Sequence, residues 1–189
     1  MTPIETILAV AVGIGLSAAA GLRVFIPPLG ANVAALSGEL PLAENMAWLG
    51  SPLATAVLAV AALVEIGAYY IPWLDNLLDT LATPMAVAAG TILTASTLGD
   101  VSPFMQWALA LVAGGGSAGA VQGSTVLLRG ASSASTGGLG NPLVSTGEAS
   151  GSLILTVLAI IAPFVALAAL VALLVYGVRR LRARRASIS

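Results

Sequence analysis

Long stretches of apolar residues without any charged side chain dominate this sequence. One runs from Pro103 to Leu128 and another from Gly151 to Val178. The hydrocarbon core of a bilayer is about 30 Å thick, and a helix needs roughly 20 apolar residues to cross it. Lipid offers the backbone no hydrogen-bond partner, and these stretches lack the alternating pattern of a barrel strand. The sequence therefore predicts an all-α integral membrane protein.

The composition excludes several classes of function. The chain has 58% hydrophobic and only 8% charged residues, whereas a soluble domain carries about 25% charged residues. It contains neither Cys nor His, which excludes disulfides, thiol nucleophiles, His/Cys zinc sites and histidine general bases. We expect no catalytic residue, no metal and no cofactor, and we predict that the protein is not an enzyme.

The apolar pattern predicts one transmembrane domain, residues 1–189, that crosses the membrane about five times. Besides the two uncharged stretches, apolar segments run from Thr6 to about Leu36, from about Gly50 to Trp73, and from Pro84 to Leu98. The last of these spans only roughly 23 Å at about 1.5 Å per residue, so four crossings result if it merely dips into the membrane. Residues 73–82 carry a face of leucines and predict a short helix lying at the interface.

The basic residues indicate the orientation. Five of the seven lie in the tail, residues 179–189, directly after the last apolar segment. Basic clusters next to membrane spans stay on the cytoplasmic side, so we predict a cytoplasmic C-terminus and no binding to nucleic acid. Five crossings then place Met1 outside.

The two halves of the chain, residues 1–100 and 101–189, are weakly similar. When the first half is shifted by 100 residues without a gap, Gly15 and Ser17 fall on a glycine and a serine of the second half. We hypothesise an internal repeat. Its copies are inverted in the membrane if the first contains three crossings, which is a common plan among transporters.

Two charged residues interrupt the apolar segments of the first half. Arg23 either lies near an interface and extends its head group to water, or lies deeper and needs a partner. Glu65 has long apolar flanks, so its carboxylate should face the protein interior or a water-filled cavity. Alternatively it serves packing alone, bonded to Arg23, Ser17 or a backbone group. Both residues fall on uncharged residues in the repeat, which favours a role special to the first half.

The remaining charged candidates lie between the apolar segments. Asp75 and Asp79 stand four residues apart on one helical face, where like charges repel, so they either face water or handle a cation or proton. If the helix that contains Glu65 continued through Pro72, a polar stripe would extend from Glu65 toward the surface through Tyr69, Pro72, Asn76 and Asp79. Asp100 is expected in a loop or cap. Arg129 and Glu148 flank a segment rich in Gly and Ser, which predicts a flexible loop across which they can pair.

Small residues crowd two of the predicted spans. They let membrane helices approach closely, either within the chain or between copies of it in a homo-oligomer. A second interpretation is a thin or broken stretch beside a solute path. The residues concerned are Gly13, Gly15, Ser17, Gly21, Gly114, Gly115, Gly116, Ser117 and Gly119.

The stretch VEIGAYYIPWLDNLLDTLATPMAVAAG, residues 64–90, resembles an uncharacterised family of small bacterial multi-pass membrane proteins, catalogued as a domain of unknown function. The matching positions are Glu65, Pro72, Asp75, Asp79 and Pro84, and GLRVFIPPL at 21–29 is similar to the end of the family's first span. Two tyrosines, 69 and 70, stand where the family has an Asp-Lys pair. The resemblance implies a bacterial inner-membrane location and supplies no activity.

These features favour a protein that resembles a transporter, flippase or channel, with Arg23, Glu65, Asp75 and Asp79 lining a path for a polar or charged solute or its coupling proton. The alternative is a membrane scaffold or assembly partner that transports nothing and packs through its Gly/Ala/Ser faces. An intramembrane enzyme is the weakest of the three hypotheses, because no motif of a catalytic site is present. The substrate is not specified by these residues.

Overall fold

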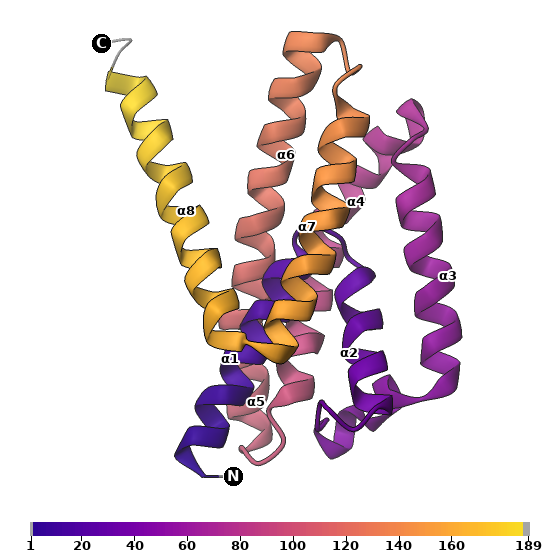
Figure 1. The fold of residues 1–189 in the computed structure, drawn as a ribbon, viewed down its shortest axis with the longest axis vertical. Coiled ribbons are helices and arrows are strands. Elements are labelled where there is room, and N and C mark those ends of the chain that lie inside the picture. The colour runs from indigo at the N-terminus through magenta and orange to yellow at the C-terminus, as the bar shows by residue number, and fades with distance from the viewer. Residues whose placement is uncertain (1, 187–189) are drawn as a thin grey trace.

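A computed structural model describes residues 2–186, except for the side chains of residues 72–77, 79, 173–174, 176–178 and 180–186. Within this range the chain forms eight α-helices, which confirms the predicted all-α class (Figure 1). A 3₁₀ turn, η1, and a π-helical turn, η2, lie between them. The elements are α1 (Pro3–Ala20), α2 (Ile26–Leu36), η1 (Glu44–Gly50), α3 (Pro52–Ala68), α4 (Pro72–Thr97), α5 (Pro103–Leu109), η2 (Ala110–Gly115), α6 (Gly116–Thr136), α7 (Asn141–Ile161) and α8 (Pro163–Ala186).

The first apolar segment is a helical hairpin rather than one interrupted span. α1 starts at the end of the molecule that carries the N-terminus, and α2 runs back toward that end (Figure 1). A capping box of Thr2 and Glu5 begins α1, and the chain reverses over residues 21–25. Pro27 and Pro28 lie in the first turn of α2, where proline is well tolerated because the first N–H groups of a helix have no intrahelical partner. The prolines therefore start a new helix at the reversal.

The predicted polar stripe from Glu65 toward Asp79 is wrong, because the helix does not continue. α3 ends at Ala68, and Ile71 is extended before α4 begins. Pro72 explains the break, since a proline disfavours the helical conformation of the residue before it. The separate interfacial helix predicted at 73–82 is also not found: these residues form the first part of α4, which continues through Pro84 to Thr97.

The fifth apolar segment also divides into two helices. α7 ends at Ile161, Pro163 begins α8, and the chain reverses direction between them (Figure 1). α7 begins at Asn141, inside the segment that was predicted to be a flexible loop. That segment is instead a helical hairpin. α6 and α7 are joined by a tight turn in which Gly137 and Gly138 adopt positive φ angles of 63° and 90°, a conformation that glycine accepts at little cost.

Three helical stretches are long and apolar enough to cross a membrane, judged over the described residues: α1, α5–η2–α6 and α7. η1 and α3, bent by 61° at their junction, count as a fourth if they form one span. The count of five crossings stays a prediction. The structure does not show the repeat, because the reversal at 21–25 corresponds to residues 121–125 in the uninterrupted helix α6.

Small and hydroxyl-bearing residues hold α1 against α4 and η2. The Ser17 hydroxyl donates to the backbone oxygen of Gly90 at 2.6 Å and lies 2.9 Å from the Thr94 hydroxyl. A Cβ added to Gly114 would lie 2.6 Å from that same backbone oxygen, and one added to Gly13 would lie 2.9 Å from Cα of Thr94. These helices therefore pack backbone to backbone, at a separation that larger side chains would prevent.

Candidate functional site

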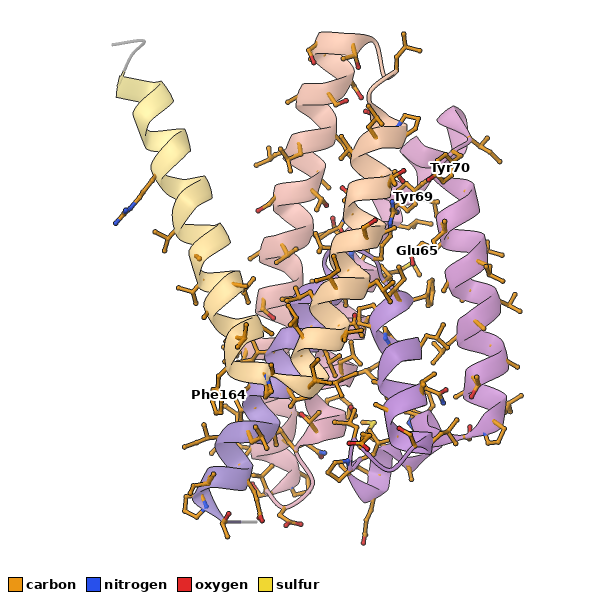
Figure 2. The ribbon with its side chains drawn as sticks, in the orientation of Figure 1. Glu65, Tyr69, Tyr70 and Phe164 are labelled. Atoms are coloured by element: carbon orange, nitrogen blue, oxygen red, sulfur yellow. The ribbon has the colours of Figure 1, made fainter. Side chains whose placement is uncertain are left out.

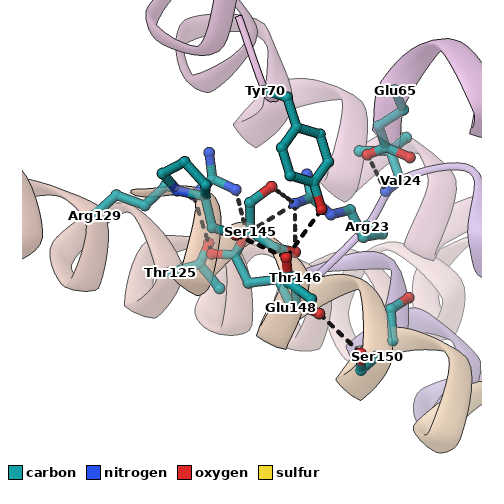
Figure 3. A network of polar contacts seen from close by, with 12 residues as sticks. Arg23, Val24, Glu65, Tyr70, Thr125, Arg129, Ser145, Thr146, Glu148 and Ser150 are labelled. Atoms are coloured by element: carbon teal, nitrogen blue, oxygen red, sulfur yellow. Dashed lines mark hydrogen bonds and ion pairs between the residues drawn. The ribbon is translucent and has the colours of Figure 1, made fainter. Parts of the chain in front are cut away.

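Three candidate residues from separate parts of the sequence meet in one buried cluster: Arg23, Arg129 and Glu148. Arg23 lies at the reversal between α1 and α2, Arg129 on α6 and Glu148 on α7 (Figure 3). Their side chains are between 1% and 6% exposed. The interfacial alternative for Arg23 is therefore excluded, and the buried, paired alternative is observed.

Glu148 is the carboxylate that both arginines share. Arg129 donates from Nε to Oε1 at 3.1 Å, and a second, shorter contact joins its Nη2 to Oε2. Arg23 Nη2 lies 3.4 Å from the same Oε2. The pairing of Arg129 with Glu148 predicted from the sequence is confirmed. Buried charges require such partners, because an isolated charge in a low-dielectric interior is very costly.

Tyr69 lies between the two arginines. The Cζ atom of Arg23 is 3.8 Å from the centroid of its ring, and that of Arg129 is 4.1 Å from it. Such cation–π contacts contribute about 2 kcal/mol when they are desolvated. The neighbouring Tyr70 hydroxyl lies 2.9 Å from that of Thr146 on α7. The tyrosine pair thus joins the end of α3 to the charged cluster.

Glu65 holds the hairpin in place through its backbone. Its Oε1 accepts from the N–H of Val24 at 2.8 Å, and its Oε2 accepts from the N–H of Phe25 at 3.0 Å. These donors immediately precede α2, so the carboxylate occupies the electropositive N-terminal end of that helix. Of the partners considered from sequence, the backbone is the one observed for Glu65, while Arg23 pairs with Glu148.

Arg23 has more donors than the cluster satisfies. Its Nη2 donates to the backbone oxygen of Ser145 at 2.8 Å and also contacts the hydroxyl of that residue. Its Nε and Nη1 atoms are buried and have no hydrogen-bond partner. A guanidinium stays protonated at any physiological pH, so it cannot escape this cost by losing its charge.

An apolar groove of about 680 Å³ lies next to the cluster. One face of α3 forms one wall, and Leu78, Ala82 and Met85 of α4 form the other. Glu65 and Tyr69 line the groove as well, and Figure 2 shows both near the end of α3 that leads to α4. The charged cluster is therefore next to a space large enough for part of a ligand.

A family model described as a domain of unknown function (DUF4126) matches residues 10–183. The chain belongs to this family. No curated protein and no solved structure matches it. The resemblance noted in the sequence is thus confirmed over most of the chain.

Within this DUF4126 chain, the remaining charged candidate that the structure describes lies in a different part of the fold from the cluster. Asp100 is exposed between α4 and α5. The side chains of Asp75 and Asp79 lie outside the described residues. No group of three or more His, Cys, Asp or Glu that could hold a metal is found in the described part of the chain. Gly116 faces open space, unlike the packed glycines before it.

Sequence reasoning missed Ser145 and gave Tyr69 no partner. The serine lies in a segment rich in Gly, Ser and Thr, and nothing in the sequence distinguishes it from its neighbours. The tyrosine had one signal, its position one turn after Glu65 on an otherwise apolar helix. The cluster also draws on both halves of the chain, because Arg129 and Glu148 lie in the second.

Proposed function

We propose that this protein moves a polar or charged solute, or a proton, across the membrane, in the manner of a transporter, flippase or channel. The observation that carries the proposal is the buried charge at the reversal of the α1–α2 hairpin. Ionisable groups inside membrane proteins are expensive and mark solute or ion pathways. Helices that are interrupted within the membrane, so that helix ends face the solute, form the binding sites of many transporters.

The arrangement of the helices supports the predicted orientation. The N-terminal end of α1 and the C-terminal end of α8 lie at opposite ends of the molecule (Figure 1), as an odd number of crossings requires. In this proposal the basic tail lies in the cytoplasm of a bacterial cell, and the α6–α7 turn and the nearby charged cluster face the same side.

The test is flux in proteoliposomes that contain the purified full chain. Entrapped pyranine reports proton flux, and the accessibility of a fluorescent phospholipid to dithionite reports flipping. The wild type should move at least one probe faster than empty liposomes, and Glu65→Gln and Arg23→Gln should each slow that movement. Glu39→Gln is the matched control, because Glu39 is exposed in the connection after α2. Movement of neither probe, or equal movement by all four proteins, would contradict the proposal.

One observation favours the alternative, a scaffold that assembles with other copies or other membrane proteins. Gly116, Gly123 and Gly130 recur at intervals of seven residues on α6, and a Cβ at any of them would meet nothing. A helix face of small residues suits close approach of another helix. Substitution of Gly123 by Leu should then disrupt assembly measured by crosslinking in membranes, and should leave flux unchanged.

A further inference from the structure

The exposed charges that the structure describes lie at the two ends of the bundle. At the end that carries the N-terminus (Figure 1) they belong to the first turn of α1, the connection after α2, the start of η1 and the connection between α4 and α5: Glu5, Glu39, Glu44 and Asp100. Toward the opposite end, α8 carries the exposed Arg179. The cluster and Glu65 lie between these sets and are 7% exposed or less. Because an exposed charge is costly in hydrocarbon, the two sets limit the layer that lipid can cover.

Exposed aromatic side chains mark the inner edge of the acidic end. Trp48 of η1 is 54% exposed, and Phe104 and Trp107 of α5 are 82% and 45% exposed. Asn45 donates from Nδ2 to Oε1 of Gln106 at 3.0 Å, so η1 and α5 lie side by side at this end. Tryptophan gathers at membrane interfaces because its ring is apolar and its N–H is polar. These three rings therefore define a first level with the composition of an interface.

Tyr70 marks a second level at the other end of α3. It is 52% exposed, and its hydroxyl lies 2.9 Å from that of Thr146 on α7. From Thr146, α7 runs about 22 Å to its end at Ile161, and α8 returns about 24 Å from Pro163 to Arg179, at 1.5 Å per residue. The exposed charge of Arg179 thus lies at about the level of Tyr70.

Two separate helical paths measure the distance between the levels. The 17 residues of α3 lie between Trp48 and Tyr70 and span about 26 Å. Along α5–η2–α6, Trp107 and Arg129 are about 33 Å apart by the same rise, and the Cζ atom of Arg129 is 4.1 Å from the ring centroid of Tyr69. The hydrocarbon core of a bilayer is about 30 Å thick. The two levels are therefore separated by the thickness of that core.

The side chains exposed between the two levels suit contact with lipid. On α3 they are all apolar, and Leu63 and Val64 are 71% and 63% exposed. Between Trp107 and Arg129, the exposed polar side chain is that of Ser124, whose hydroxyl donates at 2.9 Å to a backbone oxygen one turn earlier in its own helix. Its hydrogen-bond donor is thus satisfied without water.

Beyond Arg129 the exposed surface becomes polar. The last turns of α6 expose Ser133, Ser135 and Thr136, and Thr136 lies about 10 Å past Arg129. We propose that bilayer hydrocarbon surrounds the molecule between the two levels, that the aromatic rings of both levels contact the head-group layers, and that the tip of the α6–α7 hairpin stands in water. The charged cluster then lies at one interface and not midway through the membrane.

This placement is tested without transport; that the cluster forms the cytoplasmic end of a solute path rests on the proposed function. Spin labels on single cysteines provide the first test, in proteoliposomes of the full chain, which has no native Cys. Ala120→Cys and Ser133→Cys are a matched pair, since both positions are exposed on α6. Ala120 lies about 20 Å past Trp107, well inside the proposed layer.

The label at 120 should collide more with oxygen, which concentrates in hydrocarbon, than with a water-soluble nickel chelate. The label at 133 should show the reverse order. A label at 133 reached mainly by oxygen would overturn the second level, because the cluster would then lie within the hydrocarbon. A label at 120 reached mainly by the nickel chelate would overturn the layer itself.

Fluorescence quenching tests the first level. In the variant Trp48→Phe/Trp73→Phe, Trp107 is the single tryptophan left. Lipids brominated near the head group should quench it more strongly than lipids brominated near the ends of their acyl chains. The opposite order would overturn the first level. The expected depths without flux would refute transport alone, and flux with other depths would refute the placement alone.

Discussion

Removal of the Glu148 charge should destabilise the protein more than removal of any exposed charge. Its Oε2 lies 3.4 Å from Arg23 Nη2, and it also pairs with Arg129. At an effective dielectric constant of about 20, the attraction between unit charges at that distance is roughly 5 kcal/mol. Measured losses on breaking buried ion pairs are about 3–5 kcal/mol, because one charge stays buried without compensation. We therefore expect Glu148→Gln to lower the free energy of unfolding by about 3–5 kcal/mol.

A double variant tests the direct contact between Arg129 and Glu148. Glu148→Gln/Arg129→Gln removes both members of this ion pair, so its loss of stability should be smaller than the sum of the losses of the two single variants, a non-additive result that residues in direct contact commonly show. The control Glu39→Gln should change stability by less than about 0.5 kcal/mol, as expected for an exposed position.

The assay is reversible unfolding by SDS in mixed micelles, followed by circular dichroism, together with thermal unfolding. For a chain of this size, the expected loss corresponds to a fall in Tm of about 6–20 °C. A fall below about 2 °C for Glu148→Gln would refute the argument from burial. Additive losses in the double variant would refute the argument that the two side chains stabilise the protein through their direct contact.

Further predictions follow from the same geometry. Glu65→Leu should cost about 2–5 kcal/mol, because two buried backbone N–H groups lose their acceptors, and Glu65→Gln should cost less in the same SDS titration, since it keeps one acceptor. Gly114→Ala should destabilise by about 1–3 kcal/mol through overpacking against α4, whereas Gly116→Ala, which meets nothing, should be neutral or stabilising; equal effects would contradict the packing argument. The chain has no native Cys, so Ser37→Cys and Leu139→Cys should label with impermeant maleimide from opposite sides of the membrane. Labelling from the same side would contradict a bundle that spans it.

The all-α class of this protein follows largely from the local composition of its sequence. The uncharged stretches require helices, because lipid leaves the backbone no other way to satisfy its hydrogen bonds. Glu65 and Arg23 stood out for the same reason: a charge among apolar neighbours needs a partner wherever the chain folds. The sequence did not show where each helix ends. Pro72 and Pro163 mark breaks between helices, yet α4 continues without a break through Pro84.

The direction in which the chain leaves a break is a tertiary property. The hairpin of α1 and α2 reverses because α2 packs against α3 and α7 while Glu65 binds the backbone before it. Neither contact is visible within the segment itself. The same limit explains the error over the second uncharged stretch, where one long apolar run hides two antiparallel helices.

The sequence by itself determined that this chain is all-α with stretches apolar enough to cross a membrane, and which of its charged residues need partners, because hydrophobicity and charge are properties of single residues. The tertiary structure alone decided that Arg23 and Arg129 share Glu148 across Tyr69, and that a groove lies beside them. Those contacts join residues from α1 to α7, and their energies depend on distances of a few ångströms that no spacing along the chain encodes.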